Sequence, residues 1–162
     1  INTVGMPDDD ATHAHYLAEF LDIYTTKSFT MTTVFHNVHT VLQGFYDSGI
    51  ALGLCTNKPE TSTHSVLTQF ELNPFFKSVV GGDRLSTRKP DPEMLQLVMK
   101  ELAVDHCLFV GDSEVDVATA KAAGVPIALF TRGYRKTSVQ NLNPDFHFDE
   151  YASLPAIVNQ LF

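Results

Sequence analysis

The spacing of apolar residues alternates along the chain between the period of a strand and the period of a helix. Val38, Val41 and Phe45 recur at helical spacing, and Gly49 is a typical helix stop. Short apolar runs predict strands at 50–55, 78–80, 107–110, 127–130 and 146–148. Helices are predicted at 38–46, 61–70, 92–102, 115–123 and 154–161. Asp91 is the expected N-cap of the third helix.

This alternation predicts an α/β protein built on a parallel sheet. Helices of about 10 residues between strands act as right-handed crossovers and cover both faces of the sheet. The strand runs are apolar nearly throughout, as in strands buried on both faces. The first 35 residues differ, because an amphipathic helix expected at 12–24 leads into a polar stretch at 25–33 with no strand. We therefore place a domain boundary near Thr33.

Composition and charge narrow the classes of function. Apolar residues make up 44% of the chain, which is enough for a packed core and too much for a disordered protein. Asp and Glu outnumber Lys and Arg by 19 to 11, so the formal charge is −8 and argues against nucleic acid or an anionic membrane as partner. The longest apolar run, 122–130, falls well short of the roughly 18 residues that a membrane span needs.

The chain has two cysteines, which is too few for a disulfide scaffold. Cys55 and Cys107 both lie in strand-like runs, where free thiols are usually buried. We therefore expect reduced thiols and a cytoplasmic protein.

Three polar segments directly follow predicted strands. They are Thr56-Asn57-Lys58, the stretch 88–92 (RKPDP) and the stretch 111–116 (GDSEVD). Ligands of an open parallel sheet bind outside the carboxyl ends of its strands. We therefore expect these segments, far apart in the sequence, to meet at one edge of the sheet.

The residue types in these segments suit one task. Asp112 and Asp116 are carboxylates placed to hold a hard cation such as Mg²⁺. Lys89 offers a positive charge and Thr56 a hydroxyl, so together they could bind a dianionic phosphoryl group. Each segment taken alone has a simpler explanation. The segment at Asp112 could be an Asx turn, Lys89 a solvated surface side chain, and Thr56-Asn57 the entry to a helix. Their conjunction at successive strand ends favours a phosphate site.

The segments CTNKP (55–59), RKPDP (88–92) and GDSEVD (111–116) resemble the second, third and fourth motifs of the haloacid dehalogenase superfamily of phosphohydrolases. The segments VVGGD (79–83) and AKAAGVP (120–126), with Gly133-Tyr134, are similar to its bacterial phosphoglycolate phosphatase branch. The resemblance covers residue 38 to the C-terminus. It implies a three-layer, Rossmann-like parallel-sheet core at 36–162 and the remnant of a helical cap domain at 1–35.

The resemblance also implies roles for individual residues. Thr56 would hydrogen-bond the phosphoryl oxygen, and Lys89 would stabilise the nucleophile and the transferring group. Asp112 would ligate Mg²⁺, with Asp116 helping directly or through water. Asn57 is a further candidate for substrate binding, and Ser113 is a weaker candidate for the site. The expected substrate is a small phosphorylated metabolite, hydrolysed through an aspartyl-phosphate.

The first motif of the superfamily, an apolar strand followed by Asp-x-Asp-Gly-Thr, has no counterpart in these residues. Asp8-Asp9-Asp10 is a poor substitute, because no adequate strand precedes it and Ala11-Thr12 replaces Gly-Thr. We expect a portion of a longer protein that lacks the nucleophile and the central strand and is inactive by itself. The strands ending at Cys55 and Val110 should therefore not be hydrogen-bonded neighbours.

Other functions remain open at this point. A sugar-phosphate mutase would use the same chemistry on another substrate, and an inactive relative would bind a ligand without turnover. A receiver domain also arranges Asp, Thr and Lys around Mg²⁺. Its phosphoacceptor precedes the Thr and its Lys comes last, whereas here the metal carboxylates come last.

Overall fold

A computed structural model of the chain describes residues 12, 15, 16 and 32–162. The chain divides into two compact units, Ile1–Thr33 and Val34–Phe162. Of the helix predicted at 12–24, the structure describes Thr12, His15 and Tyr16, which are helical. Asp8-Asp9-Asp10 lies outside the described residues, and the assignment of the first unit to a cap domain stays a prediction.

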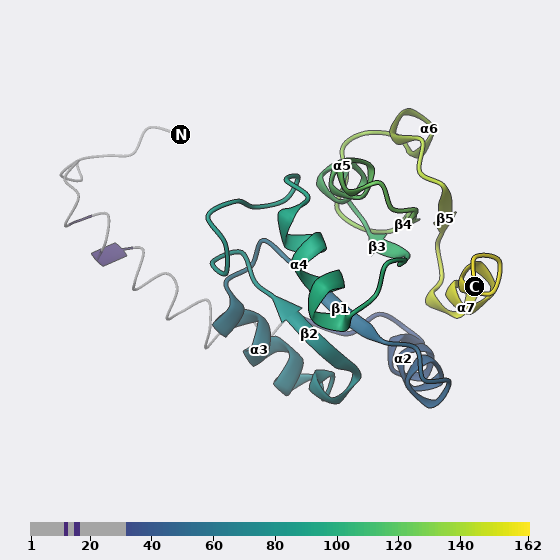
Figure 1. Cartoon of the computed structure of the whole chain (residues 1–162), viewed down its shortest axis with the longest axis horizontal. Helices are drawn as coiled ribbons and strands as arrows, with labels where there is room; N and C mark the ends of the chain where they lie inside the picture. The colour runs from purple at the N-terminus through teal and green to yellow at the C-terminus, as the bar shows by residue number, and fades with distance from the viewer. Residues whose placement is uncertain (1–11, 13–14, 17–31) are drawn as a thin grey trace. The chain divides into compact units, whose positions relative to one another are not determined.

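The second unit alternates helices and strands in the predicted order (Figure 1). Its strands are β1 (Leu52–Cys55), β2 (Phe76–Val80), β3 (Phe109–Gly111), β4 (Ile127–Phe130) and β5 (Phe146–Phe148). Its helices are α2 (Val38–Asp47), α3 (Glu60–Gln69), α4 (Glu93–Leu102), α5 (Glu114–Ala123), α6 (Val139–Leu142) and α7 (Leu154–Val158), with 3-10 turns η1 (Asn73–Phe75) and η2 (Tyr151–Ser153). Within the described residues, no helix combines the length and the hydrophobicity of a membrane span.

The strands form two parallel sheets. β1 pairs with β2, and β4 lies between β3 and β5. In this part of the chain β1 and β3 belong to different sheets, so the prediction that they are not hydrogen-bonded neighbours is confirmed. The parallel α/β architecture is confirmed as well.

The predicted boundaries differ from the observed ones by a few residues. The strand predicted at 78–80 begins two residues earlier, at Phe76. The N-cap of α4 is Pro92 rather than Asp91, because Asp91 still lies in the preceding turn. Its carboxylate nevertheless accepts a hydrogen bond from the backbone N–H of Glu93, the first residue of α4, at 3.0 Å. The closing helix ends at Val158, and α6, η1 and η2 were not predicted, because such short turns carry too few residues to show a period.

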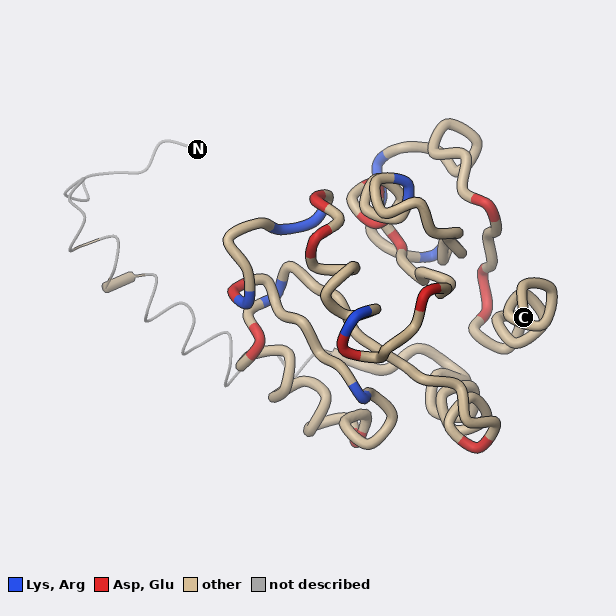
Figure 2. The backbone as a smooth tube through the Cα atoms, in the orientation of Figure 1, with Lys and Arg blue, Asp and Glu red and all other residues tan. Residues whose placement is uncertain are grey.

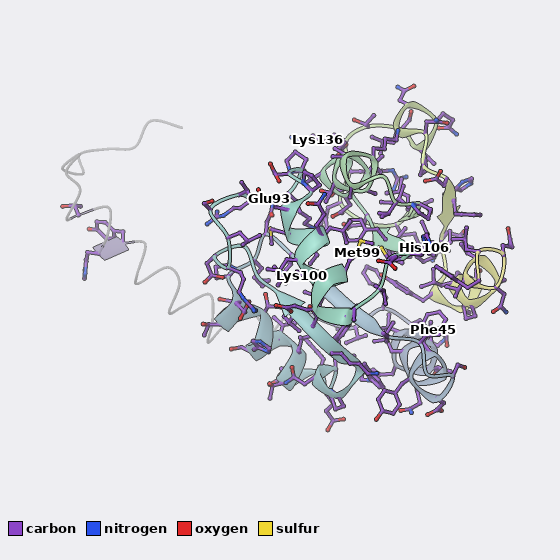
Figure 3. The ribbon with its side chains drawn as sticks, viewed as in Figure 1. Phe45, Glu93, Met99, Lys100, His106 and Lys136 are labelled. Carbon is purple, nitrogen blue, oxygen red and sulfur yellow. The ribbon has the colours of Figure 1, made fainter. Side chains whose placement is uncertain are left out.

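Strand β4 shows how the core is layered. All its residues are buried, and they alternate between two clusters. Ala128 and Phe130 pack on one face with residues of α2 and α7. Phe45 of α2, which is labelled in Figure 3, belongs to this cluster. Ile127 and Leu129 pack on the other face with residues of α5. Because side chains alternate across a strand, helices on both sides give the predicted three layers.

The sheet of β1 and β2 has its own apolar cluster. Val80 of β2 packs against Met94 and Val98 of α4, and Val80 and Met94 have no exposed surface. Gly53 of β1 lets α4 approach closely, since a Cβ there would lie 2.3 Å from Cγ1 of Val98. Helix α4 therefore holds the two strands whose carboxyl ends lead into the first two polar segments.

Candidate active site

The three polar segments meet through direct contacts. The Asn57 side chain, after β1, hydrogen-bonds the backbone of Lys89, which lies in the loop after β2. The Lys89 ammonium contacts Asp116 in the first turn of α5, which follows β3. The amide of Asp112 donates to the same carboxylate. Lys89 thus lies at the same strand ends as Asp112, as the parallel topology predicts.

Lys89 and Asp116 form a shielded ion pair. Nζ of Lys89 lies 2.7 Å from Oδ1 of Asp116, and the two side chains are 11% and 8% exposed. Burial raises the pKa of the Asp116 carboxyl, but the charge of Lys89 and the hydrogen bonds to the carboxylate outweigh it and lower the pKa below its ordinary value. The Lys89 ammonium also lies 5.6 Å from the centre of the Phe109 ring. Asp116 is therefore ionised at neutral pH.

The second carboxylate oxygen of Asp116 accepts hydrogen bonds from the residues that lead into α5. Oδ2 accepts hydrogen bonds from Asp112 N at 3.1 Å, Ser113 N at 3.1 Å and Ser113 Oγ at 2.6 Å. Ser113 Oγ in turn accepts from Asp116 N, which completes a capping box. Gly111 makes room for this carboxylate, since a Cβ there would lie 2.3 Å from Cβ of Asp116. Both oxygens of Asp116 are thus engaged by protein donors.

Acidic residues begin α5 and a lysine lies in its last turn, an arrangement that complements the helix dipole (Figure 2). Oε1 of Glu114 accepts from Lys136 N at 2.6 Å and Thr137 N at 2.5 Å. These backbone hydrogen bonds, chiefly the one from Thr137, lower the pKa of Glu114 to about 2. Glu114 therefore fastens the loop after β4 to the start of α5.

The loop after β4 also reaches Asp112, a contact that sequence reasoning missed. Tyr134 N donates to Oδ2 of Asp112 at 3.0 Å. Gly133 permits this approach, because a Cβ there would lie 2.2 Å from Cβ of Asp112. The pair Gly133-Tyr134 after a predicted strand was the available signal, because the carboxyl end of β4 lies beside that of β3.

Thr56 and Cys55 complete the β1 side of the site. Thr56 N donates to Val80 O at 3.1 Å, and Thr56 Oγ1 accepts from Lys58 N at 3.2 Å. Among the described residues the hydroxyl has no acceptor for its own proton, which leaves it able to donate to a bound oxygen. Burial raises the pKa of the Cys55 thiol to about 11, so Cys55 is protonated and unsuited to act as a nucleophile.

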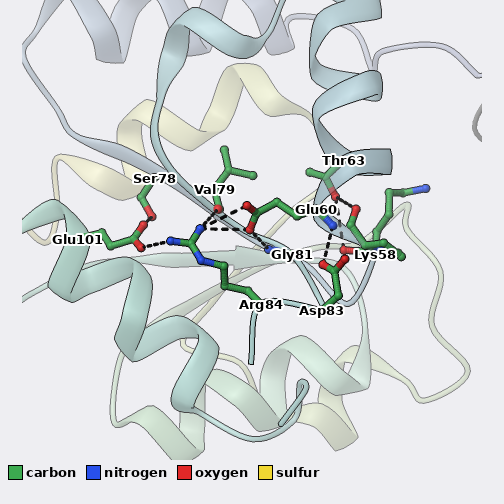
Figure 4. A network of polar contacts seen from close by, with 10 residues as sticks. Lys58, Glu60, Thr63, Ser78, Val79, Gly81, Asp83, Arg84 and Glu101 are labelled. Atoms are coloured by element: carbon green, nitrogen blue, oxygen red, sulfur yellow. Dashed lines mark hydrogen bonds and ion pairs between the residues drawn. The ribbon is translucent and has the colours of Figure 1, made fainter. Parts of the chain in front are cut away.

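A network of polar contacts around Arg84 holds the loop after β2 (Figure 4). The Arg84 guanidinium pairs with Glu60 of α3 at 3.2 Å and with Glu101 of α4 at 2.8 Å. Gly82 N donates to Lys58 O at 2.8 Å, and a Cβ at Gly82 would lie 2.2 Å from Asn57 O. The loops after β1 and β2 therefore pack directly on each other.

Asp112 and Asp116 are the carboxylates at this site that could take part in holding a cation. Within residues 32–162, no group of three or more His, Cys, Asp or Glu side chains is placed to hold a metal ion. Mg²⁺ prefers carboxylate oxygens and keeps several waters. Oδ1 of Asp112 has no protein donor in the described part of the chain, so Asp112 suits direct ligation. Asp116, with both oxygens engaged, suits a contact through water.

The fold and this site define a class of hydrolase. The family model for haloacid dehalogenase-like hydrolases matches residues 3–130, so the chain belongs to that family. A phosphoglycolate phosphatase of Cereibacter sphaeroides is 37% identical over 157 residues, covering 97% of this chain and 72% of the relative. A phosphoglycolate phosphatase of Rhodospirillum rubrum is 43% identical over 149 residues, covering 91% of this chain and 61% of the relative. The resemblance inferred from the motifs is confirmed.

Solved structures agree with the fold. The crystal structure of a predicted phosphoglycolate phosphatase from Haemophilus somnus superposes with a TM-score of 0.86 at 26% identity, over 93% of this chain and 68% of that one. That of a predicted phosphatase from Clostridium acetobutylicum gives a TM-score of 0.80 at 21% identity, over 94% of this chain and 72% of that one. The second likeness supports the fold alone.

Proposed function

We propose that this chain is part of a Mg²⁺-dependent phosphatase that hydrolyses a small, phosphoglycolate-like phosphomonoester. The observation that carries the proposal is the shielded contact of Lys89 with Asp116 at 2.7 Å. Thr56 and Asp112 directly follow β1 and β3 and are the other residues that we assign to the site. The relatives named phosphoglycolate phosphatase support the choice of substrate. We place the protein in the cytoplasm, with no nucleic acid or membrane as partner.

The residues present would bind and orient the phosphoryl group. The Lys89 ammonium has three N–H donors, of which one is directed to Asp116. In the described part of the chain the other two have no acceptor, so they could contact phosphoryl oxygens. The Thr56 hydroxyl would donate to another oxygen of the same group. Fixed donors of this kind stabilise the charge that develops on the equatorial oxygens during transfer.

Asp112 would hold Mg²⁺ directly, and Asp116 would do so through water. The cation, when bound, neutralises charge on the phosphoryl oxygens. The attacking group would be an aspartate, forming an aspartyl-phosphate, from an apolar strand followed by Asp-x-Asp-Gly-Thr, a motif that has no counterpart in the 162 residues. We therefore expect no hydrolysis by these 162 residues alone.

Replacing Asp112 by Asn in the full-length protein tests this proposal. The change removes a metal ligand while keeping size and shape, so kcat for phosphoglycolate in the presence of Mg²⁺ should fall at least about 100-fold. Asp105→Asn is the matched control, because Asp105 is exposed and precedes β3 at its opposite end. It should leave kcat unchanged.

Three results would count against the proposal. Activity that survives excess chelator or the Asp112→Asn change would refute the metal role. Faster turnover of a hexose phosphate into its isomer than into free phosphate would favour a mutase. A full-length protein that binds phosphate esters without turnover would be an inactive relative.

A further inference from the structure

The side-chain amide of Asn57 is bonded to both backbone groups of one residue. Its Oδ1 accepts a hydrogen bond from Lys89 N at 2.9 Å, and its Nδ2 donates to Lys89 O at 3.0 Å. The two residues are 32 positions apart, so the contact joins the loop after β1 to the loop after β2. These bonds engage one of the two N–H groups of the amide and one of the two lone pairs of its oxygen.

Lys89 is thereby held at both ends. Its peptide group is fixed by Asn57, and its ammonium is fixed by Asp116 at 2.7 Å. Lys89 lies in a segment without helix or strand between β2 and α4, which gives it no regular backbone support. Asn57 lies in a loop as well, but its backbone packs directly on Gly82, since a Cβ at Gly82 would lie 2.2 Å from Asn57 O.

We propose that Asn57 is a positioning residue that sets the place of the Lys89 ammonium and does not itself bind substrate. This inference rests on the proposed phosphatase function and gives the Asn57 amide a different task from the substrate contact that the motif implied. Displacing a reacting group by about 1 Å can reduce the rate about 100-fold. A residue that acts through Lys89 should therefore change kcat, whereas a substrate ligand should also change KM.

A double-mutant cycle in the full-length enzyme separates the two roles. Asn57→Ala should lower kcat by about 10- to 100-fold and change KM less than about threefold. In a Lys89→Met background, Asn57→Ala should have no further effect, because the group it positions is gone. An equal loss in both backgrounds, with a raised KM, would show a direct substrate contact and overturn the proposal.

Hydrogen exchange tests the contact without any need for activity. The Lys89 amide should exchange at least about 10-fold faster in Asn57→Ala, because Oδ1 is its acceptor. Asn57→Asp keeps that acceptor and should preserve most of the protection. Asn57 is exposed, so the variants should fold, and a thermal melt verifies this.

Asn73→Ala is the matched control. It also removes an exposed side-chain amide hydrogen bond, from Nδ2 to Thr68 Oγ1 at 2.6 Å. Asn73 lies in η1, which precedes β2, whereas Lys89 lies in the loop that follows β2. Asn73→Ala should change neither Lys89 exchange nor kcat. Unchanged Lys89 exchange in Asn57→Ala refutes the positioning role whatever the activity. An inactive wild type whose Lys89 exchange still responds to Asn57→Ala refutes the phosphatase function and leaves the backbone contact established.

Discussion

At the scale of single residues, Asp116 connects two parts of the candidate site. One oxygen holds the Lys89 ammonium, and the other holds the first turn of α5. Removing one partner of a buried ion pair leaves the other charge unpaired, and this costs more than the pair itself contributes. Asp116 therefore has a structural role that can be measured apart from catalysis.

Asp116→Asn should lower the free energy of unfolding by about 3 kcal/mol at pH 7, as measured by urea denaturation. The pKa of Asp116 is lower in the folded protein than its ordinary value of 3.8, so its stabilisation is present above that value. It is lost as the pH falls through the lower, folded pKa. The difference between the wild type and the variant should therefore shrink below pH 3.8.

Asp149→Asn is the control for this effect. Asp149 pairs with Arg132 at 3.8 Å, but both side chains are largely exposed. Solvent-exposed ion pairs contribute little to the stability of the folded state, so Asp149→Asn should leave the free energy of unfolding nearly unchanged at every pH. A destabilisation by Asp116→Asn that is equally small would contradict the role of the shielded pair.

At the scale of elements, the start of α5 is where β3, β4 and their loops are joined. Asp112 accepts from Tyr134 N, and Glu114 accepts from Lys136 N and Thr137 N. The loop after β4 has no helix or strand before α6, so these carboxylates define its path. Its order should therefore depend on them.

Glu114→Ala should speed hydrogen exchange at the amides of Lys136 and Thr137, because both lose their acceptor. The pKa of Glu114 is about 2, so the wild-type protection should be the same at pH 7 and pH 4 once the intrinsic exchange rates are corrected for. Glu93→Ala is the control, since Glu93 is an exposed carboxylate that accepts from Thr87 Oγ1 in another loop. Equal protection in the wild type and Glu114→Ala would contradict this attachment.

At the scale of the whole molecule, separate apolar clusters support the two sheets. Val80, Met94 and Val98 join β2 to α4, whereas β4 is buried between α5 on one face and α2 and α7 on the other. The contact between Lys89 and Asp116 links the loop that follows β2, in one sheet, to helix α5, which follows β3 in the other sheet. Loss of either core should therefore disturb the site.

Met94→Ala should lower the free energy of unfolding by about 2–5 kcal/mol, because Met94 has no exposed surface and its removal leaves a cavity. Gln96→Ala, on the exposed side of the same helix, should change it by less than about 0.5 kcal/mol. Chemical denaturation of both variants gives the comparison. Similar values for the two would mean that α4 does not anchor the β1 and β2 sheet.

Much of the fold could be predicted from the sequence. The apolar runs that became β4 and β5 were located to the residue, because each is short and bounded by polar residues, Gly or Pro. The alternation of strands and helices then implied parallel strands, and parallel strands place Lys89 and Asp112 at the same ends. The residue types of the candidate site follow from local sequence alone.

The partners of those residues were decided by tertiary structure. No pattern indicates that the Asn57 amide bonds to a backbone 32 positions away. Gly133-Tyr134 after a predicted strand points to a loop at the same edge of the sheet, but it does not identify Asp112, 22 positions away, as the acceptor of Tyr134 N. Such contacts depend on how closely two loops approach, which is set by the packing of the strands and helices beneath them and by glycines such as Gly82 and Gly133. Hydrophobic periodicity is a property of one segment of the sequence. A hydrogen bond between two distant loops depends on where the fold places each loop, so periodicity cannot predict it.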